Sequence, residues 1–148
     1  MYSVRPSDEQ MKLILEAWEK VKALDDTCVA QGVILFRHIF TIAPEALQLF
    51  PFKDEEDLYE SEGLKKHGKN VIKHMDRAIT DWENEGPKLV QLGKRHAGYG
   101  VQPPHFEVVG QAFIKTLEEG LGDGFTEETK AAYLKLWECV ETNMKKGM

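Results

Sequence analysis

Apolar residues recur at spacings of three and four along most of the chain, and this period constrains the fold more than any other feature. The first run follows a capping box formed by Ser7 and Gln10, and it carries Met11, Ile14, Leu15, Trp18 and Val21. A period near 3.6 residues is typical of amphipathic helices. Since no convincing strand pattern accompanies it, the sequence predicts an all-α fold.

Capping and turn residues divide this pattern into separate helices. Asp25-Asp26-Thr27 ends the first helix and offers the N-cap of a second, more apolar one. The predicted elements that follow are a short turn from Pro44, an acidic irregular stretch over 50–60, a long helix from about Tyr59 to Thr80, a turn at Gly86-Pro87, a short helix that carries His96, a helix that begins at Pro103-Pro104, and a last helix capped by Thr126.

Composition narrows the class of protein. A chain of 148 residues suits one domain, taken as 1–148, and its net charge of −6 argues against a nucleic-acid partner. No apolar run approaches a bilayer span, and Met1–Pro6 has no hydrophobic signal region, so we expect no membrane association and a cytoplasmic location. Cys28 and Cys139 form no disulfide framework and are expected to be reduced, buried or half-buried thiols.

Two histidines fall within the apolar stripes of separate predicted helices. His67 shares a stripe with Leu64 and Val71, and His96 follows Leu92 by four residues. A lone histidine in such a stripe is usually a core residue bonded to a backbone carbonyl, since an unpaired buried ring costs free energy. A pair on two helices also suits haem iron, which takes axial ligands from both faces. Both interpretations stay open on this spacing alone.

Zinc competes with iron as the metal for these histidines. His67 and His96 lack the close spacing and the further ligands that a zinc site needs, although His74 lies seven residues after His67. No Cys-x-x-Cys-His motif occurs, so a haem would be held without thioether bonds. We therefore favour non-covalent haem over zinc, and we leave His38, His74 and His105 as structural or surface residues.

Four residues in register give the chain its resemblance to the globin family. Segment 42–50, which ends at Phe50, resembles the globin C helix and the corner after it, and Lys66–Val71 resembles the distal stretch of the E helix. Leu92–His96 resembles the proximal stretch of the F helix, and His96 follows His67 by 29 residues, as in the family pattern. The resemblance covers about 7–147 and implies helices A to H around haem b, with the D helix reduced or absent.

The resemblance also implies a role for each matching residue. His96 corresponds to the proximal iron ligand, and His67 to the distal residue that faces the iron or binds it. The residues expected to line the haem pocket are Phe50, Val71, Phe36, Leu92, Val101 and Phe106. Asn70, together with Lys69 and Arg95, is a candidate for contacts with the haem propionates. Gly32 and Gly68 match the small residues at which the B and E helices of globins cross closely.

Within the family the likeness is greatest to neuroglobin-like globins of the invertebrate type, in which the distal histidine binds iron when no gas is present. The expected function is reversible binding of oxygen, carbon monoxide and nitric oxide, for storage, supply or sensing. The alternative is redox work: electron transfer, nitric oxide dioxygenation, nitrite reduction or peroxide chemistry, with a redox partner protein as electron source. His96 is expected to donate a hydrogen bond to a carbonyl near Gln91 or Leu92, which fixes its tautomer.

Overall fold

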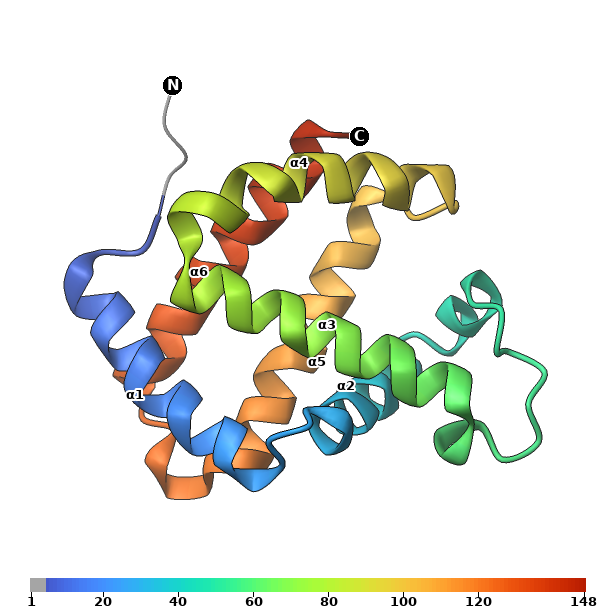
Figure 1. Ribbon diagram of the computed structural model, residues 1–148, viewed down its shortest axis with the longest axis horizontal. Coiled ribbons are helices and arrows are strands. Elements are labelled where there is room, and N and C mark those ends of the chain that lie inside the picture. The colour runs from blue at the N-terminus through green and yellow to red at the C-terminus, as the bar shows by residue number, and fades with distance from the viewer. Residues whose placement is uncertain (1–4) are drawn as a thin grey trace.

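Helices account for most of the computed structural model, which describes residues 5–148 (Figure 1). Within that range no strand occurs, and the predicted all-α fold is confirmed. The elements in order are α1 (Asp8–Leu24), α2 (Val29–Ile42), the 3-10 helices Pro44–Leu49 and Leu58–Glu60, α3 (Glu62–Thr80), α4 (Trp82–Gly98), α5 (Pro103–Leu121), the 3-10 turn Gly122–Gly124, and α6 (Glu127–Lys146). The prediction that Met1–Pro6 has no signal region concerns in part residues 1–4, which lie outside the described residues.

Side-chain caps explain where the first two helices begin. The Ser7 hydroxyl accepts from the Gln10 amide at 3.1 Å while the Gln10 side chain accepts from the Ser7 amide at 3.0 Å, which is the predicted capping box. Before α2, the Asp25 carboxylate accepts from the amides of Thr27 at 3.0 Å and Ala30 at 2.9 Å. The Thr27 hydroxyl also accepts from the Val29 amide at 3.4 Å, so Asp25 and Thr27 cap α2, and Cys28 connects them to the helix with φ of 68°.

Helix α4 corrects one prediction. The prediction of a turn at Gly86-Pro87 is wrong, because α4 runs unbroken from Trp82 through Pro87 to Gly98. Pro87 lacks an N–H for the carbonyl four residues earlier, but Glu83 is exposed near the start of the helix, where water can satisfy that carbonyl. The helix is fixed in addition from α6, since the Asn143 side-chain amide donates to the Gly86 carbonyl at 2.9 Å.

The segment before α3 carries the reduced D region that the resemblance implies. It contains a single three-residue 3-10 helix, Leu58–Glu60, where a longer helix would otherwise stand. Helix α3 therefore begins at Glu62 rather than near Tyr59, because the Ser61 hydroxyl caps it by accepting from the Leu64 amide at 3.3 Å. This short connection leads directly from Phe50 to the helix that carries His67.

Helices α2 and α3 cross in close backbone contact. A Cβ atom added to Gly32 would overlap the backbone of Gly68, and one added to Gly68 would overlap Gly32. The crossing expected from the family resemblance is therefore confirmed. Gly93 of α4 packs in the same way on the backbone of α6 at Met144. These contacts fix α3 and α4, the two helices that carry the histidines.

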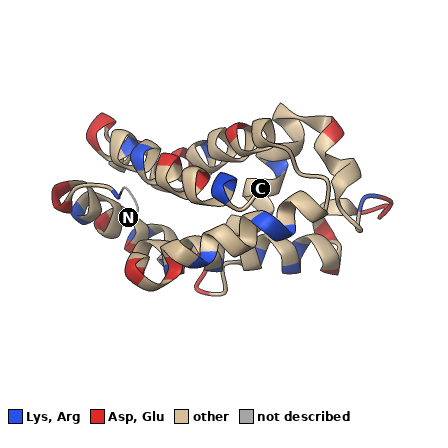
Figure 2. Ribbon diagram, turned by 90° about the horizontal axis from the view of Figure 1, so that it is seen from above, with Lys and Arg blue, Asp and Glu red and all other residues tan. Residues whose placement is uncertain are grey.

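Polar links tie the outer helices to this frame. The indole N–H of Trp18 in α1 donates to Asp76 of α3 at 2.8 Å, and the Lys22 ammonium lies 3.1 Å from the same carboxylate. The Tyr133 hydroxyl of α6 donates to the Ile14 carbonyl of α1 at 2.8 Å. Acidic and basic residues are interspersed along the helices (Figure 2). Over residues 5–148, no helix is both long and apolar enough to cross a bilayer.

Candidate functional site

One cavity of about 620 Å³ brings together the residues that the sequence placed at the site, apart from Lys69. Its walls come from α2, the 3-10 helix Pro44–Leu49, α3, α4, α5 and α6. The predicted residues that line it are Phe36, Phe50, His67, Asn70, Val71, Leu92, His96, Val101 and Phe106. The volume falls in the range of small-molecule and cofactor sites, and aliphatic and aromatic side chains form most of the lining.

His96 enters the cavity from α4 with a fixed tautomer. Its Nδ1 lies 2.7 Å from the carbonyl oxygen of Leu92, one helical turn earlier. Because a carbonyl oxygen can only accept, Nδ1 carries a proton, and in the neutral ring Nε2 therefore keeps its lone pair. The predicted hydrogen bond is thus confirmed, with Leu92 as the acceptor. A histidine arranged in this way is ready to donate Nε2 to a metal.

His67 enters the cavity from α3 within a group of phenyl rings. The centre of its imidazole lies 5.5 Å from that of Phe36, 5.3 Å from that of Phe50 and 6.1 Å from that of Phe52. Part of the surface of His67 is accessible, and the residue lines both this cavity and a second, smaller pocket beside Phe52 and Gly63. Desolvation of the ring among these side chains, together with the nearby His96, lowers the pKa of His67, so the ring is neutral near pH 7.

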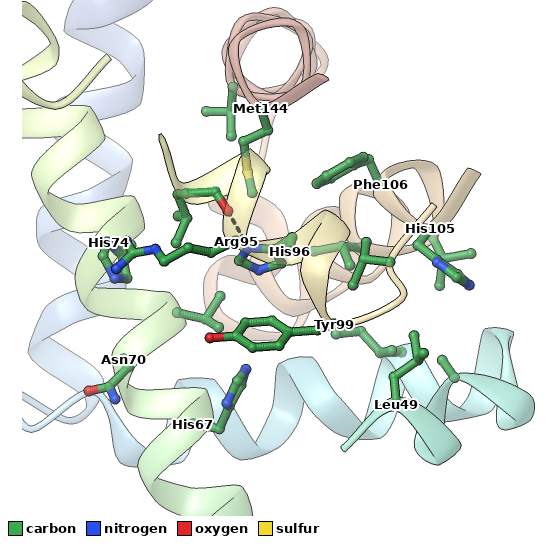
Figure 3. Close-up of a pocket in the computed structure, with 18 of the residues that line it drawn as sticks. Leu49, His67, Asn70, His74, Arg95, His96, Tyr99, His105, Phe106 and Met144 are labelled. Carbon is green, nitrogen blue, oxygen red and sulfur yellow. Dashed lines mark hydrogen bonds between the residues drawn. The ribbon is translucent and has the colours of Figure 1, made fainter. Parts of the chain in front are cut away.

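The two histidines approach the cavity from opposite sides. In Figure 3 His67 points from α3 towards the space that His96 faces from α4. Among residues 5–148 no three His, Cys, Asp or Glu side chains gather as a metal cluster. Zinc would need three or four such ligands, whereas haem iron needs at most two axial ones. An apolar cavity with one imidazole on either side therefore fits a flat, greasy macrocycle with a central metal.

The sequence did not predict three residues that line the cavity or lie next to it. His74, predicted to be a structural or surface residue, is half-buried and also lines the cavity beside Asn70. Its spacing of seven from His67 already placed it on the same helix face. Phe52 is buried and its ring stacks on Phe50 at 5.1 Å. Tyr99 also lines the cavity, although it lies in the turn after α4, where apolar periodicity gives no signal.

Two further histidines have structural contacts, as predicted. The His38 ring pairs with the Glu119 carboxylate, which joins α2 to α5. The Nδ1 atom of His105 accepts from the Gln102 amide at 2.9 Å and caps α5, and His105 also lines the cavity wall. Arg95 and Asn70 line the cavity too, where both are largely exposed. The cavity therefore has an apolar interior and a few polar or cationic side chains in its wall.

Comparison with known proteins agrees with this geometry. The family model described as Globin matches residues 33–144. The chain is 29% identical to a neuroglobin of Tetraodon nigroviridis, over 95% of this chain and 91% of the relative. It is 32% identical to an anaerobic nitrite reductase of Arabidopsis thaliana over 94% of each chain, and 31% identical to an anaerobic nitrite reductase of Brassica napus over 96% of this chain and 91% of the relative. The chain belongs to the globin family and is a haem globin.

Proposed function

We propose that this globin binds oxygen, and with it carbon monoxide and nitric oxide, reversibly at ferrous haem b held without covalent bonds between His96 and His67. In the absence of gas, His67 would bind the iron together with His96. The observation that carries the proposal is the fixed tautomer of His96, whose Nε2 lone pair is available on the side of the cavity that faces His67.

His96 is the proximal ligand in this proposal. Haem would supply an iron that imidazole or a diatomic gas can bind. The hydrogen bond from Nδ1 to the Leu92 carbonyl holds the imidazole plane and raises the basicity of Nε2. Leu89, Leu92 and Phe106 line the cavity with it and contribute an apolar wall.

His67 has two roles that exclude each other at any moment. A neutral imidazole has one N–H donor and one lone pair, so His67 can donate a hydrogen bond to a gas or offer its lone pair to the iron. The phenyl rings of Phe36, Phe50 and Phe52 confine the imidazole in either state. Because the two states compete, the apparent gas affinity is the intrinsic affinity reduced by the open fraction.

Charged and polar groups complete the proposed haem contacts. Arg95 and Asn70 line the cavity, and Lys69 precedes Asn70 on α3. We assign these three residues to the two haem propionates, because a guanidinium, an ammonium and an amide are suitable donors to carboxylates. The cavity interior, by contrast, is lined by residues such as Val71 and Met75, which exclude water from the centre.

Nitrite reduction is the second candidate function. It is favoured by the likeness to two plant proteins named anaerobic nitrite reductases. The reaction consumes an electron, so it requires a redox partner protein as the electron source. The two free thiols, both buried, agree with a reducing cytoplasmic setting in which such partners occur.

The visible spectrum of the purified ferrous protein without oxygen tests the first proposal. Two sharp bands are expected for an iron with both histidines bound, and a single broad band would overturn the bis-histidine state.

His96→Ala should lose stable haem, and unchanged haem uptake and spectrum would contradict the proximal assignment. Anaerobic nitrite with a one-electron reductant separates the two functions, since only a nitrite reductase releases nitric oxide through repeated turnovers.

A further inference from the structure

The exposed side of α3 is cationic, although the chain carries a net charge of −6. Lys66, Lys73 and Arg77 recur at spacings of seven and four, so their side chains lie on one exposed face of the helix, here called the cationic face. The two acidic residues of α3 lie elsewhere, since Glu62 is its first residue and Asp76 pairs with α1. The cationic face therefore has no negative charge within its own helix.

Lys66 and Lys73 are available to a partner. Among residues 5–148 neither ammonium group forms an ion pair, and both residues are exposed. Arg77 is partly neutralised, because its guanidinium lies 3.7 Å from the Glu85 carboxylate, and Glu55 lines the smaller pocket with Lys66 without pairing to it. Lys73 and Arg77, four residues apart, repel each other, and an anionic partner would relieve this repulsion.

The cationic face borders the wall of the cavity. Asn70 lies one helical turn from both Lys66 and Lys73, and it lines the cavity as well as the smaller pocket. His74 directly follows Lys73 and also lines the cavity. In Figure 3 Asn70 and His74 project from α3 beside the space that His67 enters. A protein seated on this face would be separated from the cavity by one helix, which is a short path for an electron.

The distribution of charge favours a small acidic protein over a membrane surface. Exposed charges are screened beyond about 10 Å at 0.1 M salt, so a small partner meets mainly the cationic face. A flat anionic bilayer would also meet the acidic segment 54–57, of which Glu55 borders the same pocket as Lys66. The net charge of −6 repels an acidic protein from the rest of the molecule, and this repulsion orients it on α3.

We propose that the cationic face of α3 is the docking surface for a small acidic electron-transfer protein. In the docked pair one electron passes from the reduced carrier to ferric haem iron, which leaves the carrier oxidised and the iron ferrous. The inference rests on the proposed function, because nitrite reduction needs an external electron donor. Lys66 and Lys73 orient the carrier, and their charges raise the rate of productive encounter.

Charge reversal tests this docking surface. Reduced plant-type ferredoxin, a one-electron carrier of low potential, is the acidic probe, and stopped-flow absorbance follows reduction of the ferric holoprotein without nitrite or oxygen. At low ionic strength Lys66→Glu/Lys73→Glu should be reduced about tenfold more slowly than wild type, and high salt should remove the difference. Lys66→Gln/Lys73→Gln should show an intermediate loss. The matched control is Lys12→Glu/Lys20→Glu, which makes the same change of charge on exposed residues of α1 and should stay within about twofold of wild type.

Two further measurements separate docking from other roles of the lysines. Calorimetric titration with oxidised ferredoxin should show weaker binding to ferric Lys66→Glu/Lys73→Glu than to wild type. Photoreduced lumiflavin, a small neutral reductant, should reduce both proteins at the same rate. Slower reduction of the variant by lumiflavin would assign the lysines to the haem site, and an equal loss in Lys12→Glu/Lys20→Glu would assign the effect to net charge. Either result overturns the proposal, as does a reduction rate that does not depend on salt.

The remaining outcomes concern the kind of partner and the proposed function. Binding of wild type to vesicles that contain phosphatidylserine, without binding to ferredoxin, would overturn the assignment of a protein partner. Normal reduction by lumiflavin with wild-type ferredoxin kinetics in Lys66→Glu/Lys73→Glu refutes only the docking surface. Nitrite turnover driven by lumiflavin tests the proposed function by itself, because that reductant needs no docking surface.

Discussion

The two ring nitrogens of His96 have different environments, and this difference makes one of them a potential ligand. Nδ1 is engaged with the Leu92 carbonyl at 2.7 Å, so Nε2 is the atom that can face a metal. Among residues 5–148, His67 has no comparable hydrogen bond, and surrounding rings hold it instead. The proximal side is thus fixed by a hydrogen bond, whereas the distal side is confined only by packing, which permits the ring to change partner.

Replacing the distal imidazole tests its role as a hydrogen-bond donor. His67→Leu should release oxygen about tenfold faster, because a lost hydrogen bond to a partly charged ligand costs roughly 1–3 kcal/mol. Carbon monoxide release should change less, since that ligand is less polar. Stopped-flow measurement of both off-rates checks the prediction, with His38→Leu as a control outside the cavity. An unchanged oxygen off-rate in His67→Leu would contradict the proposed bond.

Asp25 gives a pH-dependent prediction. Hydrogen bonds from the Ala30 amide and from Thr27 lower the pKa of Asp25 below its ordinary 3.8. A lowered folded-state pKa means that the carboxylate contributes stability above its unfolded pKa and loses it as the pH falls through the folded value. Asp25→Ala should therefore lower the thermal midpoint at pH 7, and the difference from wild type should shrink in acid.

Thermal unfolding between pH 7 and pH 2 measures this difference. The neighbouring Asp26→Ala is the matched control, because Asp26 is exposed and does not cap α2. If the gap between Asp25→Ala and wild type stayed constant down to pH 2, the carboxylate would not be the source of the stability.

At the scale of elements, the crossing of α2 and α3 leaves no room for a side chain at either glycine. Gly32→Ala places a methyl group against the backbone of Gly68, and such overpacking costs about 1–3 kcal/mol. Gly124→Ala is the control, because no atom lies within 4 Å of its added Cβ. Denaturant unfolding of both variants checks the difference. Equal stabilities would show that the helices separate without cost.

Local sequence patterns predicted most of the helices and the place of both histidines at one cavity. They did not predict the features that depend on contacts between distant residues. The bond from His96 to Leu92 was predictable because it lies within one helical turn. The continuity of α4 through Pro87 was not, since the helix is fixed from α6 by Asn143. Tyr99 was missed for a similar reason, because only the meeting of α4 and α5 brings this turn residue to the cavity.

At the scale of the whole molecule, the two thiols are enclosed by the packed helices. Cys28 and Cys139 are 5% and 2% exposed, and burial raises the pKa of both thiols. The reactive thiolate is therefore scarce at neutral pH. Native protein should react with a thiol-specific dye slowly, and unfolded protein should react promptly at both cysteines. Rapid native labelling would indicate that the helices open far more often than this packing allows.

The contact between Gly32 and Gly68 also limits how sequences of this kind can diverge. Phe36 follows on α2, and His67 directly precedes Gly68 on α3. A side chain gained at either glycine pushes these helices apart and carries both distal residues with them. The width of the pocket above the iron is thus set by two positions that have no side chain. A larger residue at either position is therefore expected to widen the pocket between Phe36 and His67.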